Sequence, residues 1–209
     1  MTEIVHLVGC GPGGPDWVPP RAREIVRKAD VIFGPSDLQD LFPEAPGARM
    51  DLPARPENAA PLVLAALGRR LGCAVLVRGD CGLHSLAKGL QSRLPAGACR
   101  RIAGVSSVQV ACAAFGLDWQ GARILSAHGR PLQELGPDDR QVPLVVVLGG
   151  GERFHEILER TREALGPWRL HLASDVTLPT ESLRTIAPGE RIPSGLPSRT
   201  IALFERTGP

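Results

Sequence analysis

The sequence predicts an α/β protein of two domains, with a mostly parallel sheet in the first and a mixed sheet in the second. In the first half of the chain, short apolar segments of strand length alternate with longer segments of helical periodicity. This alternation is typical of a parallel sheet that helices cover on both faces. Beyond about residue 119, apolar strands follow one another with little helix between them. We therefore predict an N-terminal α/β domain over 1–118 and a C-terminal α/β domain over 119–209.

The first domain begins with a strand over 4–8 that ends in a loop rich in glycine and proline. A helix over 19–29 follows, with two prolines in its first turn, where a backbone N–H is not needed. A polar section broken by prolines comes after the second strand, 30–35. The remaining expected elements are a helix over about 57–71, a buried strand and loop over 73–80, a helix over 82–94, and a strand, tight turn and helix over 99–116.

The second domain contains one predicted helix, over 152–165, among several strands. The segment 142–151, VPLVVVLGGG, is the most apolar of them and is expected to be buried. The other expected strands lie at 122–129, 168–175, 182–189 and 199–206.

Composition and charge exclude several partner classes. The chain has 209 residues, of which 43% are hydrophobic and 22% charged, as in an ordinary globular protein. A formal net charge of +2 without a dense basic stripe argues against nucleic acid. No apolar run is long enough to span a bilayer, so we expect no membrane association and a cytoplasmic protein.

The cysteine and histidine spacings predict no protein-bound metal. The five cysteines form no C-x-x-C pair, and three of them, Cys73, Cys99 and Cys112, fall in apolar segments typical of small core residues. The five histidines show no metal-ligand spacing.

The opening loop, Gly9 to Gly14, matches the dinucleotide fingerprint G-x-G-x-x-G. In that fold, however, the helix begins inside the glycine turn and points its N-terminus at the pyrophosphate. Here prolines delay the helix until about residue 19, and Asp30 stands at the start of the second strand instead of its end. A nicotinamide or flavin oxidoreductase is therefore a third-ranked alternative.

The same loop resembles the N-terminal signature of the tetrapyrrole methylases, which begin V-G-x-G-P-G-x-P, then a helix, then A-D-V-x-x-G. The chain has VGCGPGGP at 8–15 and ADVIFG at 29–34. VLVRGDCG at 75–82 is similar to the strand and Gly-Asp loop of the family. VSSVQ at 105–109 and SAHGR at 126–130 resemble the branch that methylates carbon 5 of precorrin-7 or its cobalt complex. The resemblance is strong up to residue 130 and looser after it.

The resemblance implies the tetrapyrrole methylase fold of two α/β domains, with the active site in the cleft between them. It implies S-adenosylmethionine as cofactor, with S-adenosylhomocysteine as product, and a corrinoid precursor as substrate, whose cobalt, where present, belongs to the substrate. It also implies a homodimer and, as a possible partner, a separate C15-methyltransferase/decarboxylase of the same pathway. The implied cofactor-binding residues are Pro12, Gly79, Asp80, Leu83, Ser106, Ser107, Leu148 and Gly149; the implied substrate-binding residues are Gly11, Gly13, His128 and Arg130.

Several of these residues also have a plainer interpretation. Asp80 could cap the next helix, and Ser106 and Ser107 stand where N-cap residues belong. His128 ends an apolar strand, where a surface histidine is the ordinary case, but it could shuttle the proton associated with methylation of a meso carbon. Arg130 is suited to hold an acetate or propionate group of a corrinoid.

Some positions depart from the family pattern. Arg78 stands where a small residue is usual and Cys81 where proline is usual; Leu83 and His84 replace an aromatic pair, Ala103 replaces a proline, and the residues 149–152 replace a Thr-Asp pair. The alternatives that stay open are another tetrapyrrole methylase, a diphthine-synthase-like methyltransferase, and a corrinoid-binding relative without catalysis. Whether the substrate carries cobalt also stays open.

Overall fold

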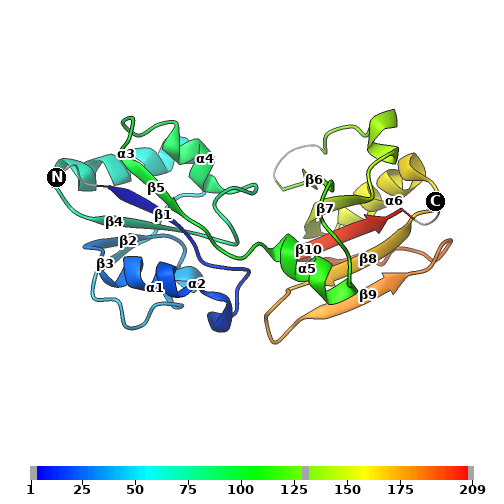
Figure 1. Cartoon of the computed structure of the whole chain (residues 1–209), viewed down its shortest axis with the longest axis horizontal. Coiled ribbons are helices and arrows are strands. Elements are labelled where there is room, and N and C mark those ends of the chain that lie inside the picture. Colours follow the sequence, from blue (N-terminus) through cyan, green and yellow to red (C-terminus); the bar gives the residue numbers. More distant parts are fainter. Residues whose placement is uncertain (1–3, 129–131, 207–209) are drawn as a thin grey trace. The chain divides into compact units, whose positions relative to one another are not determined.

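The structure is a computed structural model that describes residues 4–128 and 132–206. The chain divides into two compact units, and the division falls between Ser106 and Ser107 (Figure 1). The predicted boundary lies later, after residue 118. The helix between the two positions, α5 (Ser107–Phe115), belongs to the second unit, where the ring of Phe115 packs on that of His171 at a centroid distance of 4.6 Å.

The first unit contains a five-stranded sheet in the order β3-β2-β4-β1-β5, in which every neighbouring pair is parallel. The predicted parallel sheet is thus confirmed. Its strands are β1 (Val5–Gly9), β2 (Val31–Phe33), β3 (Ala48–Met50), β4 (Cys73–Val77) and β5 (Cys99–Ile102); its helices are α1 (Pro20–Arg27), α2 (Ser36–Gln39), α3 (Pro56–Gly68) and α4 (Leu86–Gln91).

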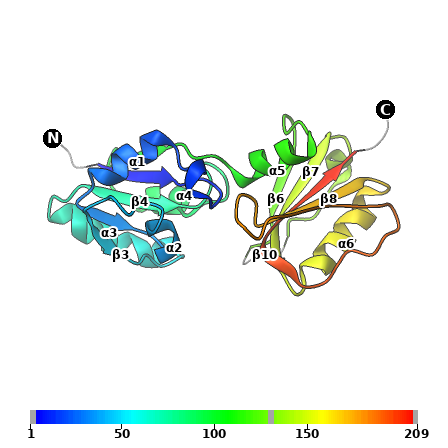
Figure 2. The same ribbon diagram turned by 90° about the horizontal axis from the view of Figure 1, so that it is seen from below.

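Helices cover both faces of this sheet, as predicted, because each central strand is apolar on both sides (Figures 1 and 2). Alternate residues of β1 point to opposite faces. Leu7 packs in the cluster that contains α3 and α4, and Val8 packs in the cluster that contains α1 and α2. Both clusters consist of fully or nearly fully buried side chains.

Two short elements occur where the sequence predicted only a polar section. The strand β3 has three residues, all exposed, and α2 has four residues, so neither carries the apolar periodicity that marks an element in sequence. Arg49 in β3 instead joins the two elements, because its guanidinium donates to the carbonyl oxygens of Gln39 and Phe42 at 2.5 and 2.7 Å.

The start of α4 corrects the predicted helix over 82–94. The helix begins only at Leu86, after the N-cap Ser85, whose hydroxyl accepts from the Ala87 N–H at 3.3 Å. The preceding residues cannot be helical, because His84 has a φ of +44°. The residues between β4 and α4 therefore form a longer loop than predicted.

The second unit contains a mixed five-stranded sheet in the order β6-β7-β10-β8-β9, which confirms the predicted mixed sheet. The pair β6 and β7 is parallel, and all other pairs are antiparallel. The helix α6 packs on one face, and α5 covers the other (Figure 2). The strands and α-helix after α5 are β6 (Arg123–Ser126), β7 (Leu144–Gly151), α6 (Phe154–Leu165), β8 (Arg169–Ser174), β9 (Ser182–Ile186) and β10 (Leu196–Glu205), with a short 3-10 helix over Pro137–Arg140.

The connections of the first sheet change face between the neighbouring strands β1 and β4. The strands β1 and β4 are neighbours, but the helix after β1 packs on one face and the helix after β4 on the other. Chain segments that leave adjacent strands toward opposite faces open a ligand-binding crevice outside the carboxyl ends of those strands.

In the part of the chain that the structure describes, no helix combines the length and the apolar character of a membrane span.

We predict a pH-dependent stability that originates at His6 in β1. Burial, the neighbouring cross-strand residue Arg100 and then Arg21 lower the pKa of His6 below its ordinary value of 6.5. The unfolded chain therefore binds a proton here before the folded one does, so the free energy of unfolding should fall as the pH drops from about 7.5 to 5. His6→Gln should flatten this part of the profile, measured by urea unfolding at each pH; an unchanged slope would contradict the assignment.

Candidate functional site

Loops follow the carboxyl ends of three neighbouring strands, β4, β1 and β5, and backbone hydrogen bonds join two of these loops directly. The N–H of Gly79 donates to the Gly11 carbonyl at 2.8 Å, and the N–H of Gly11 donates to the Gly79 carbonyl at 3.3 Å. The Cys10 N–H also donates to the Val77 carbonyl at 2.9 Å. Backbone hydrogen bonds therefore hold the loop after β1 and the loop after β4 side by side.

Glycine is required where the three loops meet, at Gly9, Gly79 and Gly104. A Cβ on Gly104 would lie 2.2 Å from the Gly79 carbonyl oxygen and 2.7 Å from the Gly9 carbonyl carbon. A Cβ on Gly9 would lie 2.6 Å from the Gly104 nitrogen. Gly79 also has a φ of +65°, which favours glycine. We call these three residues the glycine junction.

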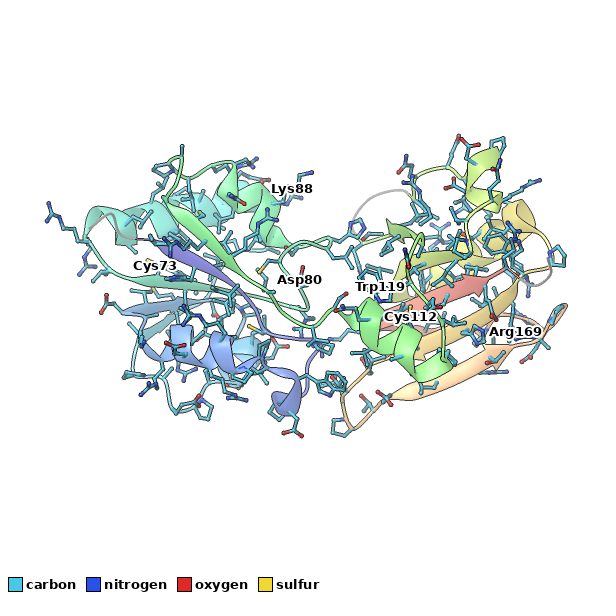
Figure 3. All side chains as sticks on the ribbon, viewed as in Figure 1. Cys73, Asp80, Lys88, Cys112, Trp119 and Arg169 are labelled. Carbon is cyan, nitrogen blue, oxygen red and sulfur yellow. The ribbon has the colours of Figure 1, made fainter. Side chains whose placement is uncertain are left out.

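The Asp80 carboxylate fastens the loop after β4 to the loop after β5 (Figure 3). One oxygen, Oδ1, accepts from the Gly82 N–H at 2.7 Å, and the other, Oδ2, accepts from the Gly104 N–H at 3.0 Å. Helix α4 is capped by Ser85 instead, so capping of that helix does not explain Asp80. Both carboxylate oxygens of Asp80 thus accept from backbone N–H groups.

Cys81 anchors the loop after β4 to the sheet. Its side chain is buried, and Sγ lies 3.0 Å from the Leu7 carbonyl oxygen and 3.2 Å from that of Ile102, on two neighbouring strands. Burial, together with the Asp80 charge, raises the pKa of the Cys81 thiol to about 11. The thiol is therefore protonated at neutral pH and donates to a carbonyl, so it is a packing residue rather than a nucleophile.

The other predicted residues of the first unit lie on the same loops. Pro12 and Gly11 are buried in the loop after β1, and Leu83 is half-buried in the loop after β4. Gly13 follows Pro12 on the loop after β1. Ser106 is 8% exposed and directly precedes α5, of which Ser107 is the first residue.

The loop after β1 does not support a dinucleotide site. The chain first forms a 3-10 turn over Pro15–Trp17, and α1 starts only at Pro20. No α-helix therefore begins inside the glycine loop, as the prolines predicted.

The predicted residues of the second unit meet at the carboxyl end of its parallel strand pair. Ser126 of β6 pairs with Leu148 of β7, and the Ala127 N–H donates to the Leu148 carbonyl at 2.8 Å. His128, which follows, is exposed, and its backbone N–H donates to the Ser126 hydroxyl at 3.4 Å. Leu148, Gly149 and His128 thus share one edge. The prediction for Arg130 lies outside the described residues.

Gly149 leaves room for an aromatic ring. A Cβ at this position would lie 2.2 Å from Cε2 of Phe154, the first residue of α6. The close approach brings α6 against the end of β7, where the family pattern expects a Thr-Asp pair.

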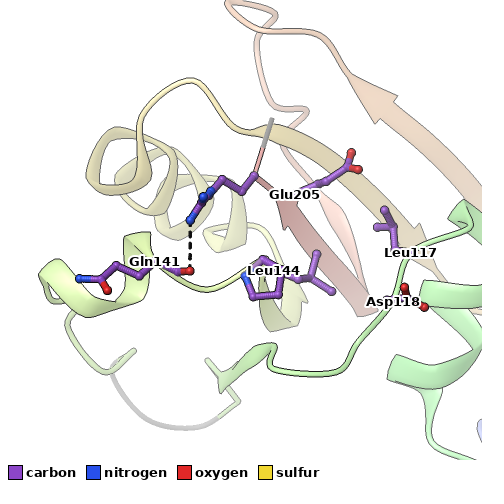
Figure 4. A pocket seen from close by; sticks show the side chains of 7 residues that line it. Leu117, Asp118, Gln141, Leu144 and Glu205 are labelled. Carbon is purple, nitrogen blue, oxygen red and sulfur yellow. Dashed lines mark hydrogen bonds between the residues drawn. The ribbon is translucent and has the colours of Figure 1, made fainter. Parts of the chain in front are cut away.

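Sequence reasoning missed two cavities, both in the second unit. One, of about 400 Å³, lies where β7 begins and β10 ends, at the opposite end of β7 from Leu148 (Figure 4). The other, of about 460 Å³, lies beside α6. No sequence pattern signals them, because their polar lining is scattered along the chain. The first is lined by Leu117, Asp118, Gln141, Pro143, Leu144, Glu205 and Arg206; the second by residues 132–135, Ile157, Arg160, Thr161 and Ala164.

Metal-ligating side chains do not cluster in the part of the chain that the structure describes. Within residues 4–128 and 132–206, no group of three or more histidine, cysteine, aspartate or glutamate side chains is arranged to hold a metal ion.

The fold and the loops define a class: a protein of two α/β units whose candidate ligand residues lie at the carboxyl ends of parallel strands. The family model of the tetrapyrrole (corrin/porphyrin) methylases matches residues 4–189. The chain belongs to this family, and the predicted membership is confirmed.

Curated relatives and solved structures agree with this assignment. A cobalt-precorrin-7 C(5)-methyltransferase of Salmonella typhimurium is 33% identical over 127 residues, which are 61% of this chain and 62% of that protein. A probable cobalt-precorrin-7 C(5)-methyltransferase of Methanocaldococcus jannaschii is 27% identical over 132 residues, 61% of each chain. The matched stretch thus spans less than two thirds of each of these relatives.

Two solved structures show the same fold. The cobalamin biosynthesis precorrin-6Y methylase from Archaeoglobus fulgidus superposes with a TM-score of 0.72 at 21% identity, covering 100% of both chains. The uroporphyrin-III C-methyltransferase from Thermus thermophilus, crystallised with S-adenosylhomocysteine, gives a TM-score of 0.78 at 20% identity and covers 97% of this chain and 92% of that one.

We predict that Gly104→Ala destabilises the first unit, because its Cβ would overlap the Gly79 carbonyl oxygen. Overpacking of this kind costs about 1–3 kcal/mol. Urea unfolding monitored by circular dichroism measures the loss. The matched control is Gly68→Ala at the end of α3, where nothing lies within 4 Å of the new Cβ and stability should stay equal or rise by up to about 1 kcal/mol. Equal stability of the two variants would show that the junction tolerates a side chain.

Proposed function

We propose that this protein is an S-adenosylmethionine-dependent methyltransferase of cobalamin biosynthesis that methylates carbon 5 of precorrin-7 or of cobalt-precorrin-7. The observation that carries the proposal is the glycine junction, which places the family's loop motifs side by side at one sheet edge. The curated relatives bearing that name support the substrate, and the family supports the reaction.

The residues of the described loops fit this cofactor chemically. S-adenosylmethionine combines a zwitterionic amino-acid group with ribose hydroxyls, an adenine and a sulfonium cation. The loops offer backbone N–H and C=O groups, the Asp80 carboxylate, and the hydroxyls of Ser106 and Ser107 at the start of α5. A carboxylate suits the cationic groups, and a helix N-terminus favours a negative one. Pro12, Gly79, Asp80, Leu83, Ser106 and Ser107 would hold the cofactor from these loops, with Leu148 and Gly149 as the proposed contacts from the second unit.

The chemistry explains why the site consists mainly of backbone. When bound, S-adenosylmethionine supplies a methyl group on a leaving thioether that needs no proton. The protein's contribution is therefore to orient the reactants and to exclude water, tasks that rigid loops perform well. The hydrogen bonds between Gly11 and Gly79, and those that the Asp80 carboxylate accepts, join the three loops to one another.

His128 is our proposed proton carrier for the electron-rich meso carbon after methylation. Its exposed position just beyond β6, beside Leu148, gives its ring access to a ligand at this edge of the second unit. Arg130, Gly11 and Gly13 are proposed to contact the substrate, with Arg130 pairing with a carboxylate. The predicted two-domain site, the homodimer, the partner enzyme and the cytoplasmic location belong to the same proposal.

The reaction is tested with methyl-labelled S-adenosylmethionine and a panel of corrinoid pathway intermediates, read by mass spectrometry. We expect one labelled methyl group to be added to precorrin-7 or its cobalt complex. Transfer to another tetrapyrrole would move the chain to another branch of the family. Transfer to a protein side chain would favour the diphthine-synthase-like alternative. Binding of NADH with no binding of S-adenosylhomocysteine would overturn the proposal.

We predict that His128→Ala lowers turnover on the order of a hundredfold, because loss of a general acid–base group typically has that effect. The affinity for S-adenosylhomocysteine, measured by calorimetry, should stay nearly unchanged. His6→Gln is the control, since His6 lies within β1 and should affect pH-dependent stability but not turnover. Turnover of His128→Ala within about twofold of wild type, under about half a kcal/mol of barrier, would retire the catalytic role.

A further inference from the structure

Arg78 is a cation at the rim of the candidate site that none of the proposed roles uses. It directly follows β4 and precedes Gly79 of the glycine junction. Its guanidinium Nη2 donates to Oδ2 of Asp37, a residue in the first turn of α2. Because α2 follows β2, the neighbour of β4, this ion pair holds the guanidinium over the carboxyl ends of both strands.

The ion pair is better suited to orient Arg78 than to stabilise the fold. The side chains of Arg78 and Asp37 are 35% and 45% exposed, and surface pairs of this kind contribute little to stability. Arginine carries five N–H donors in a rigid planar fork, of which the bond to Asp37 occupies one. The bond to Asp37 thus holds the fork in place through one of its donors.

The charge also lies close to the loop after β1. Burial raises the pKa of Cys10 to about 12; among the smaller influences, the positive charge of Arg78 lowers it and the negative charge of Asp37 raises it. Arg78 therefore stands beside two of the loops that meet at the glycine junction, at the carboxyl edge of the parallel sheet.

We propose that Arg78 binds a carboxylate group on the periphery of the corrinoid substrate and so selects the free acid over the amide. The inference rests on the proposed function, which supplies a substrate rich in acetate and propionate groups. The guanidinium fork matches a carboxylate in a bidentate manner, whereas a side-chain amide offers a single neutral acceptor. The family resemblance expects a small residue at this position, so the contact is a feature of this chain.

The test measures binding of two corrinoid probes, dicyanocobyrinic acid with free carboxylates and dicyanocobinamide with amides, by calorimetry in the presence of S-adenosylhomocysteine. Arg78→Ala should weaken binding of the acid about tenfold or more, with little change for the amide. Arg78→Lys should fall between wild type and Arg78→Ala, because the charge remains but the fork is lost. S-adenosylhomocysteine affinity should be equal in all three proteins, which also shows that the variants are folded.

The matched control is Arg93→Ala. Arg93 pairs with Glu57 in the first turn of α3 at 4.0 Å, with side chains 43% and 53% exposed, but it follows a helix, α4, and none of the three strands that lead into the glycine junction. The Arg93→Ala substitution removes the same charge as Arg78→Ala, and it should leave the binding of both corrinoid probes unchanged. Equal binding of the acid by Arg78→Ala and wild type overturns the inference and leaves the proposed function standing. Weakened S-adenosylhomocysteine binding with unchanged acid binding also overturns it, by assigning Arg78 to the cofactor. Failure of the wild-type protein to bind either corrinoid overturns both proposals.

Discussion

The contact between Gly9, Gly79 and Gly104, backbone against backbone, is the constraint on which the rest of the candidate site depends. Three loops approach so closely that even one Cβ would meet a carbonyl at 2.2 Å. Such contact is possible only because the strands before these loops, β4, β1 and β5, are hydrogen-bonded neighbours. The Asp80 carboxylate then closes the arrangement by accepting one N–H from its own loop and one from the loop after β5. A positioned surface of backbone groups results, without any flexible side chain at its centre.

The apolar core of the first unit packs against both faces of β1, the strand that leads into the glycine junction. Alternate residues of β1 enter two separate clusters, one under α3 and α4 and one under α1 and α2, so the central strand is held from both faces. Cys81 extends the first cluster up to the loop itself, where its thiol lies against the Leu7 and Ile102 carbonyls. Apolar packing and hydrogen bonding thus involve the same residues. A shift of the loop after β4 would disturb both. The loop after β4 is therefore held by apolar packing and by hydrogen bonds at the same residues.

The sequence predicted the layers and the loops but not the contacts within them. Apolar periodicity was sufficient for the parallel sheet and for α1, α3 and α6, because burial determines those elements. It failed for β3 and α2, which are short and held by Arg49 hydrogen bonds instead of apolar burial. It also placed α4 too early, because a positive φ at His84 and the Ser85 cap are set by the loop. The motif marked Asp80, yet its two partners, one of them 24 residues away in the loop after β5, appear only in three dimensions.

The two sheets differ in topology, but in both the predicted site residues lie where parallel strands end. In the first unit every strand is parallel, so the candidate site loops follow several strands at one edge. In the second unit only β6 and β7 are a parallel pair, and the predicted residues His128, Leu148 and Gly149 gather where those two strands end. The antiparallel strands β8, β9 and β10 broaden the sheet that α5 and α6 cover. Methyl transfer from a sulfonium demands orientation more than acid–base chemistry. Loops on neighbouring strand ends that are joined backbone to backbone are suited to that demand.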